Sequence, residues 1–314
     1  MTQHGRWSAA DIPDLSGKTA IVTGGNSGIG FEAARELARK RAHVILACRD
    51  LGKAHEAIAQ IHALLPSVSL EALQLDLASL ASVHRFAENF TARSIPLDLL
   101  LNNAGVMAIP YRKTAEGFEM QLGTNHLGHF ALTGLLLLPL LAAPAARVVN
   151  VSSTAHKMGR MNFDDLQSEK GYSKWPAYAQ SKLANLLFTY ELQRRLEDAR
   201  RSAISVACHP GYAATNLQST GPRMAGSRLM ESIMEIGNRL FSQSAAMGAL
   251  PTLYAATSPD ARGGDYIGPD GFMENTGHPK KVSSTTRSHD RQAATRLWEI
   301  SEQLTAVRYA ALSA

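Results

Sequence analysis

A glycine-rich turn near the start of the chain limits the choice of fold more than any other feature. A short β-branched run, Lys18–Thr23, leads directly into the segment GGNSGIG at residues 24–30, and a helical pattern follows over residues 27–40. Glycine permits positive φ and a close approach of the backbone, and the free N–H groups at a helix N-terminus attract anions. A strand, a glycine turn and a helix in this order predict a phosphate cradle for a dinucleotide. The residues that we expect at this cradle are Gly24, Asn26, Ser27, Gly28, Ile29 and Gly30.

Short apolar runs alternate with helical patterns along the first two thirds of the chain. Each run is continuously apolar, which indicates strands that are covered on both faces, as in a parallel sheet. The sequence therefore predicts an α/β fold with a doubly wound parallel sheet. The expected strands are residues 18–23, 43–48, 68–75, 97–101, 147–151 and 204–208, and the expected helices are residues 27–40, 53–65, 80–90, 118–141 and 177–196.

The length of 314 residues is compatible with two domains. No interdomain linker interrupts the pattern, so we expect a single domain over residues 1–314. Its cofactor half covers about residues 17–150, and its catalytic and substrate half covers about residues 151–305.

The pattern becomes less regular after the sixth strand. We expect a loop over residues 209–227, helices over 228–240 and 245–256, and a last short strand near 265–267. Methionines at helical spacing are usually part of a core, but those of this stretch also fit a C-terminal extension that forms a lid over the substrate. They are Met224, Met230 and Met234.

Composition excludes several classes of protein. The net charge of +5 is spread thinly, so we expect no nucleic-acid partner. Cys48 and Cys208 lie in apolar stretches, and we expect buried thiols rather than a disulfide. The longest uncharged run, residues 130–146, contains two prolines and is shorter than the roughly 20 residues of a membrane span. With no apolar leader at the N-terminus, we expect a cytoplasmic protein without a membrane span.

Five motifs together resemble the short-chain dehydrogenase/reductase family. They are TGGNSGIG from Thr23, Asp76-Leu77, Asn102-Asn103-Ala104-Gly105, Tyr178-Ala179-Gln180-Ser181-Lys182 and Pro210-Gly211. All five stand in the family's order over about residues 17–270. The segments NHLGHF from Asn125 and SKLAN from Ser181, and a long insertion at residues 156–175, resemble the retinol-dehydrogenase-like branch. The resemblance implies a Rossmann fold and an oxidoreductase that uses a nicotinamide dinucleotide.

The end of the second strand indicates which dinucleotide is used. An acidic residue at this position hydrogen-bonds the ribose of NAD, whereas an arginine pairs with the 2′-phosphate of NADP. Arg49 occupies the position, Asp50 follows one residue later, and Lys53 adds a charge one turn further. We therefore expect NADP(H) as the preferred cofactor, with NAD(H) as the alternative.

The family resemblance implies further cofactor contacts. Asp76, with Leu77 beside it, is expected to reach the adenine. The carboxamide end of the cofactor is expected to lie against the loop after the sixth strand. The remaining expected contacts are Asn103, Ala104 and Gly105 at the floor, and Pro210, Gly211 and Thr215 at the carboxamide end.

Tyr178 and Lys182 are the expected chemical centre. They are four residues apart in a helix and share one face. A nearby ammonium is expected to lower the pKa of the phenol and to bind the nicotinamide ribose. By register with the family motif we assign the substrate-polarising hydroxyl to Ser153, with Ser152 as the alternative.

Asn125 is expected to hold a water that relays protons from Lys182, as the resemblance implies. A buried asparagine that caps the backbone is the alternative. His126 and His129 are three residues apart, but no third ligand accompanies them, so we expect packing roles and no metal site.

The function expected from these residues is hydride transfer between a nicotinamide and a carbonyl or alcohol. Apolar segments, Val106–Pro110, residues 156–175 and Tyr212, favour a small lipophilic substrate such as a retinoid or steroid, although a secondary-metabolite ketone is equally open. A non-catalytic NADP sensor or scaffold and a nucleotide-sugar epimerase are the alternatives. The resemblance also implies a homodimer or homotetramer, formed through the long helix and the Tyr178 helix, and the run 135–141 fits either this interface or the core.

Overall fold

A single eight-stranded sheet forms the centre of the protein. The computed structural model describes residues 6–212 and 243–312. The strand order is β3-β2-β1-β4-β5-β6-β7-β8; β1 to β7 are parallel and β8 is antiparallel to β7. The strands are β1 Thr19–Thr23, β2 His43–Cys48, β3 Leu70–Gln74, β4 Leu99–Asn102, β5 Arg147–Val151, β6 Ile204–Cys208, β7 Tyr266–Pro269 and β8 Pro279–Lys281. This is the doubly wound Rossmann arrangement that the sequence predicts.

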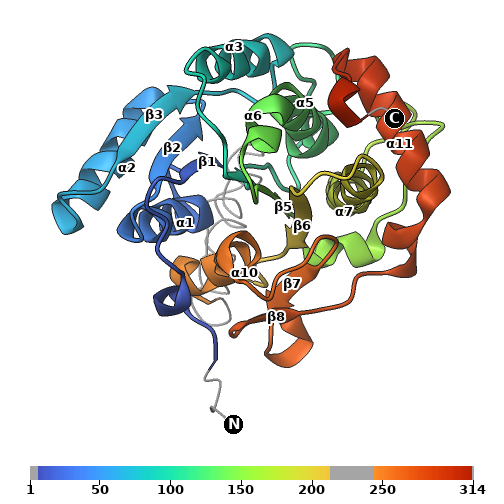
Figure 1. The fold of residues 1–314 in the computed structure, drawn as a ribbon. Coiled ribbons are helices and arrows are strands. Elements are labelled where there is room, and N and C mark those ends of the chain that lie inside the picture. Colours follow the sequence, from blue (N-terminus) through green and yellow to red (C-terminus); the bar gives the residue numbers. More distant parts are fainter. Residues whose placement is uncertain (1–5, 213–242, 313–314) are drawn as a thin grey trace.

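Helices cover both faces of the sheet (Figure 1). Helices α1 and α10 lie together on one face, with α2 beside them, and α3, α5 and α7 lie on the other. The helices are α1 Gly28–Arg39, α2 Leu51–Leu64, α3 Leu80–Thr91, α4 Met120–Leu122, α5 Gly128–Leu135, α6 Leu137–Ala142, α7 Lys174–Asp198, α10 Ala245–Thr257 and α11 Arg291–Thr305.

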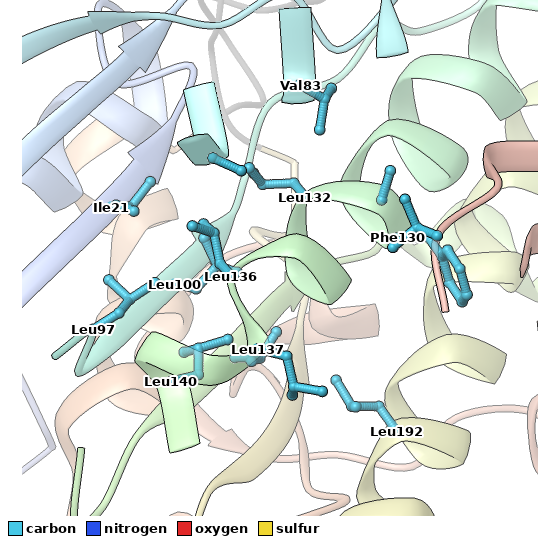
Figure 2. Close-up of a cluster of buried hydrophobic side chains, with 14 of the residues drawn as sticks. Ile21, Val83, Leu97, Leu100, Phe130, Leu132, Leu136, Leu137, Leu140 and Leu192 are labelled. Atoms are coloured by element: carbon cyan, nitrogen blue, oxygen red, sulfur yellow. The ribbon is translucent and has the colours of Figure 1, made fainter. Parts of the chain in front are cut away.

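Alternate residues of the strands supply two hydrophobic cores. Ile21 and Leu100 point from β1 and β4 toward the cluster that contains Phe130, Leu132 and Leu136 (Figure 2). The other side chains of the same strands pack against α1, α2 and α10. Because side chains alternate between faces along a strand, continuous apolar runs are required for a sheet that is covered on both sides. The continuously apolar runs predicted strands that are covered on both faces, and this prediction is confirmed.

The order of the sheet determines where a ligand can bind. Strand β1 pairs with both β2 and β4, so the chain winds outward in two directions from this strand. In open α/β sheets, ligands bind beyond the carboxyl ends of the strands at such a reversal. The glycine turn directly follows β1 and therefore lies at this edge.

The long helix expected over residues 118–141 is wrong, because the chain divides there. Helix α4 leads into a π-helical turn, Gly123–Leu127, which is followed by α5 and α6. Gly123 packs so tightly that a Cβ on it would lie 2.5 Å from Cγ2 of Thr114. At the second break, Leu136 leaves helical geometry with ψ near 10°. In the run 135–141, Leu137 and Leu140 are buried in the core whereas Leu138 is exposed.

Two elements near the C-terminus, β8 and α11, were not predicted. Helix α11 packs against α7 and α5 (Figure 1). The Trp298 ring lies 5.1 Å from that of Phe130, and the Tyr309 hydroxyl donates a hydrogen bond to the Phe130 carbonyl. The only signal in the sequence is a narrow stripe of buried residues in an otherwise polar helix, Ala294, Leu297, Trp298, Ser301 and Thr305. This helix covers part of the α5 and α7 surface at which an interface between copies was expected.

Other sequence expectations have mixed outcomes. The short strand expected near residues 265–267 is β7, and Cys48 and Cys208 are buried free thiols, as predicted. Within the described ranges, no helix is long and apolar enough to cross a membrane. The expected helix over 228–240, Thr215 and the methionines proposed for a lid lie outside the described residues.

Candidate active site

The glycine turn brings three segments into contact distances that a side chain would prevent. Gly24 has a φ of +66°, and a Cβ on it would lie 3.0 Å from Cβ of Ala104. A Cβ on Gly30 would lie 2.4 Å from the Gly24 carbonyl oxygen and 2.6 Å from Nδ2 of Asn103. The turn, the start of α1 and the loop after β4 therefore pack backbone against backbone.

The N-terminus of α1 is not capped by the side chain of its N-cap residue. Ser27 is the N-cap, but its side chain makes no capping hydrogen bond. Gly28 has a φ of +56°, and Asn26 and Ile29 are only half-buried. The first N–H groups of a helix without side-chain partners, beside a tight glycine turn, form a cradle that fits a phosphate. The residues present here therefore fit the pyrophosphate of a dinucleotide.

Thr23 holds the floor of the cradle in place, a role that the sequence did not predict. Its hydroxyl oxygen accepts hydrogen bonds from the N–H groups of Asn103 and Ala104, each at 2.9 Å. The Asn103 side chain donates to the Thr23 carbonyl. Nδ1 of His129 lies 3.0 Å from the Asn125 carbonyl and must donate to it, so Nε2 accepts from the Thr23 hydroxyl at 2.9 Å. These bonds fix the loop after β4 to the end of β1.

Burial keeps both histidines of the segment neutral. It lowers the pKa of His129 to about 4 and that of His126 to about 3. Nε2 of His126 bonds to the hydroxyl of Ser301 on α11. In the described part of the chain, no group of three or more metal-binding side chains is found, and the two histidines serve packing.

The end of β2 leaves one arginine for a ligand. Arg49 is exposed and forms no ion pair within the described ranges. Asp50 is the N-cap of α2, and its carboxylate accepts from the Lys53 N–H at 3.1 Å. The Lys53 ammonium lies 3.9 Å from the same carboxylate. The acidic residue is thus used to cap a helix, and the guanidinium has no acidic partner among the described residues.

Asp76 and Leu77 follow β3 at the same edge of the sheet. The Asp76 carboxylate accepts from the Ala78 N–H, and the Asp76 N–H donates to the Ser82 hydroxyl. Leu77 is buried, and its carbonyl packs against Gly128 at the start of α5. Both residues are held in a fixed turn.

Tyr178 and Lys182 project from the first half of α7, and both are almost fully buried. The Lys182 ammonium donates to the Val151 carbonyl at 3.0 Å and lies 5.8 Å from the centroid of the Tyr178 ring. Asn185, one turn further along α7, donates to the same carbonyl at 3.0 Å. Helix α7 is therefore fixed to the end of β5 by two side chains.

The expected lowering of the Tyr178 pKa by Lys182 is wrong for this structure. Burial raises the pKa of Tyr178 to about 12 and lowers the pKa of Lys182 to about 8. Desolvation disfavours both charged forms, and the ammonium bonds to Val151 rather than to the phenol. The Ser153 hydroxyl offsets part of the rise in the Tyr178 pKa.

The two candidate serines face different partners. Ser152 is buried, and its hydroxyl donates to the Lys182 carbonyl at 2.8 Å. Ser153 is half-buried, begins the turn Thr154–Met158, and contacts the phenol of Tyr178. The geometry therefore favours Ser153 as the hydroxyl that meets a substrate.

Asn125 lies in the π-helical turn, where all of its side-chain atoms have partners. Oδ1 accepts from the Val106 N–H at 2.8 Å, and Nδ2 donates to the Val106 carbonyl and to the Ser181 hydroxyl. A Cβ on Gly105 would lie 2.9 Å from Oδ1 of Asn125 and 3.6 Å from the Lys182 ammonium. The side chain thus caps the backbone, which was the alternative to holding a relay water. It lies close to Lys182.

The insertion at residues 156–175 is anchored beside the site by a buried glutamine. Nε2 of Gln121 donates to the Tyr172 hydroxyl, which in turn donates to the Ile109 carbonyl at 2.7 Å. The exposed Trp175 ring stands 6.3 Å from that of Tyr178. The sequence reading missed Gln121, because its role depends on contacts between distant segments.

Pro210 and Gly211 follow β6, beside the end of β5. Gly211 has a φ of +65°, and a Cβ on it would lie 2.3 Å from the Asn275 carbonyl oxygen. The structure thus brings this loop, the glycine cradle and the Tyr178 side chain to one edge of the sheet.

Comparison with known proteins connects this geometry to a family. The model of the family described as short chain dehydrogenase matches residues 18–224. Retinol dehydrogenase 12 of Homo sapiens is 42% identical over 298 residues, which cover 94% of this chain and 88% of that protein. A solved structure of an uncharacterised protein from Mycobacterium paratuberculosis is 43% identical, with a TM-score of 0.80, and covers 97% of this chain and 99% of that chain.

A second solved structure carries a ligand. It is a protein from Beutenbergia cavernae described as an NAD(P)-dependent gluconate 5-dehydrogenase, with NADP bound at low occupancy. It is 27% identical, covers 81% of this chain and 95% of that chain, and has a TM-score of 0.61.

Replacing Lys182 with Met tests the buried ammonium. Because burial lowers its pKa from 10.5 to about 8, the folded protein releases this proton at a lower pH than the unfolded chain does. Stability rises with pH wherever the unfolded state binds more protons. We expect the free energy of unfolding, relative to that of Lys182→Met, to be constant below about pH 8 and then to rise on the order of 2 to 3 kcal/mol by about pH 10.5.

Urea unfolding across this pH range measures the difference. Lys53→Met at an exposed position is the control and is expected to show no such rise. A difference for Lys182→Met that stays constant with pH would contradict the burial effect.

Proposed function

The chain belongs to the short-chain dehydrogenase family of NAD(P)-dependent enzymes, and from this premise we propose that it interconverts a lipophilic alcohol and its aldehyde or ketone with NADP(H). The observation that carries the proposal is the meeting of Tyr178, Ser153 and Lys182 at the edge of the sheet where the glycine cradle also lies.

The cofactor, when bound, supplies or accepts a hydride at its nicotinamide ring. Tyr178 gives a proton to the substrate oxygen in reduction and takes it back in oxidation. Ser153 donates a hydrogen bond to the same oxygen and orients it. A phenol with a pKa of about 12 is a weak acid, so a charge that favours the phenolate is needed when its proton leaves.

Lys182 is the group that can supply this charge. At neutral pH an ammonium with a pKa of about 8 is mostly protonated, and it lies 5.8 Å from the Tyr178 ring. In a buried site the attraction between an ammonium and a developing phenolate is only weakly screened. Lys182 is thus placed to stabilise the phenolate as it forms, although burial has the larger effect and keeps the pKa of the resting phenol at about 12.

The surroundings of Tyr178 support an apolar substrate. The Trp175 ring faces the Tyr178 ring edge-on and is 43% exposed, and Met158 is 68% exposed at the end of the turn that begins at Ser153. Exposed apolar side chains beside a reactive hydroxyl suit a hydrocarbon chain or ring. The name of the similar human protein, retinol dehydrogenase 12, points to the same class of substrate.

Arg49 supports NADP(H) over NAD(H). Its guanidinium is exposed at the end of β2, while Asp50 caps α2. A guanidinium pairs bidentately with a phosphate such as the 2′-phosphate of NADP. The protein from Beutenbergia cavernae that has NADP bound shares this fold.

Tyr178→Phe tests the proton donor. Removing the hydroxyl leaves the ring in place, so turnover of retinal or another lipophilic carbonyl should fall on the order of a thousandfold or more, while NADPH binding, measured by fluorescence, stays close to that of the unaltered protein. Tyr254→Phe, on the far face of the sheet beside Trp7, is the control. Full turnover in Tyr178→Phe would refute the assignment.

Arg49→Ala tests the cofactor preference. Loss of a charged hydrogen bond should raise the KM for NADPH by about tenfold to a hundredfold and leave the KM for NADH nearly unchanged. Steady-state kinetics with both cofactors gives the two values, and Arg308→Ala at another exposed position is the control. A lower KM for NADH than for NADPH in the unaltered protein would contradict the preference.

A further inference from the structure

The loop between β7 and β8, residues 270–278, reaches back to the active site. Its residue Glu274 ends a short 3-10 turn and lies outside the residues 18–224 that the family model matches. We propose that Glu274 is a positioning residue that holds the turn of Ser153 and the Pro210-Gly211 loop in register with each other. The inference rests on the proposed function and names a residue that adjusts its geometry.

One contact of Glu274 reaches the Pro210-Gly211 loop through His209. His209 is fully buried, and its Nδ1 accepts a hydrogen bond from the Gly211 N–H at 3.2 Å. The ring proton must then be on Nε2, which lies 3.2 Å from Oε2 of Glu274. The ring packs tightly against the backbone of Gly268, because a Cβ on this glycine would lie 2.1 Å from Nε2. The two atoms are in contact without hydrogen-bond geometry, so the carboxylate acts on the ring that holds the Gly211 backbone by attraction between its charge and the Nε2–H group.

A second contact of the same oxygen reaches the turn that begins at Ser153. Oε2 of Glu274 lies 3.3 Å from the Lys157 ammonium. Lys157 belongs to the turn Thr154–Met158, of which Ser153 is the N-cap. His156 of this turn is fully buried, and its Nδ1 lies 2.6 Å from the Ser153 carbonyl. One carboxylate oxygen therefore contacts both segments that must meet the reacting groups.

The backbone of the 270–278 loop holds the same region. The Asn275 carbonyl accepts from the Tyr212 N–H at 2.7 Å. Gln243 joins the two, because its Nε2 donates to the Pro210 carbonyl and its Oε1 accepts from the Gly277 N–H. The Pro210-Gly211 loop is thus bound to the 270–278 loop by main-chain and side-chain contacts.

The backbone at Glu274 is itself unusual. Met273 and Glu274 have φ values of +51° and +59°, a left-handed conformation that residues with a Cβ rarely adopt. Two such residues in succession persist only where surrounding contacts hold them, and they concentrate at functional sites. The turn leaves the Met273 side chain exposed, whereas the Glu274 carboxylate is mostly buried against His209 and Lys157.

This arrangement matters because hydride and proton transfer need the substrate and the nicotinamide to be aligned together. Ser153 orients the substrate oxygen, and the Pro210-Gly211 loop is expected to hold the nicotinamide end of the cofactor. A misplacement of about 1 Å can lower a rate on the order of a hundredfold. A single carboxylate that touches both segments limits their relative movement.

Glu274→Gln is the first test, because glutamine keeps the size of the side chain and removes its charge. We expect kcat to fall by about tenfold and the Kd for NADPH to rise by about tenfold. The affinity for adenosine 2′,5′-bisphosphate, which carries only the adenine half of the cofactor, should stay unchanged. Equal losses of affinity for both ligands would indicate a general structural defect and would overturn the proposal.

Glu71→Gln is the matched control. Glu71 is a half-buried carboxylate in β3, with Arg93 at 2.6 Å and Nε2 of His43 at 3.7 Å. Glu71 thus contacts a histidine and a cation, as Glu274 does. It lies near the amino end of an outer strand, however, and not at the edge where the active site lies. We expect this variant to keep the kcat and the NADPH affinity of the unaltered protein.

Lys157→Met separates the two contacts. It removes only the link to the turn of Ser153, so kcat should fall by a few fold while the Kd for NADPH stays unchanged. The proposal is overturned if Glu274→Gln keeps both the kcat and the NADPH affinity of the unaltered protein. An unaltered protein that neither binds NADPH nor reduces a lipophilic carbonyl would instead refute the proposed function.

Discussion

The site depends on one close contact, in which the start of α1 packs against the glycine turn and the loop after β4. A methyl group on Gly30 would collide with the Gly24 carbonyl and the Asn103 side chain, so only glycine allows α1 to begin there. This contact places the helix N-terminus beside the reversal of strand order between β1 and β4. Thr23 then fixes the neighbouring loop by accepting two backbone hydrogen bonds. The cradle and the floor of the site form one unit.

The chemical centre is a second unit, built on α7 and the end of β5. Lys182 and Asn185 share the Val151 carbonyl as acceptor, which fixes α7 to the end of β5. The burial that fixes these groups also disfavours their charged forms, so Tyr178 is a weak acid and Lys182 a weakened base. Such a pair is suited to moving a proton only when a substrate oxygen and a hydride partner are aligned with it.

Much of this architecture could be predicted from local sequence, and the exceptions have physical reasons. The glycine turn, the continuous apolar strands and the four-residue spacing of Tyr178 and Lys182 depend on short-range rules, and the fold they predict is the observed one. The π-helical turn at Asn125 and the packing of α11 depend on tertiary contacts that periodicity does not report. The pKa of Tyr178 was misjudged because sequence spacing shows the neighbouring charge but not the burial. Glu274 lies more than sixty residues from the nearest motif, and only the folded chain brings it to His209 and Lys157.

The central claim is that this edge of the sheet transfers a hydride between NADP(H) and a lipophilic carbonyl. The most direct measurement uses NADPH that carries deuterium at C4 of the nicotinamide, with retinal as substrate and mass spectrometry of the alcohol. We expect one deuterium on the former carbonyl carbon when the label occupies one of the two hydrogen positions at C4, and none when it occupies the other. Deuterated water should leave that carbon unlabelled. An alcohol that carries no deuterium from either label, or one labelled at that carbon by the solvent, would contradict the central claim.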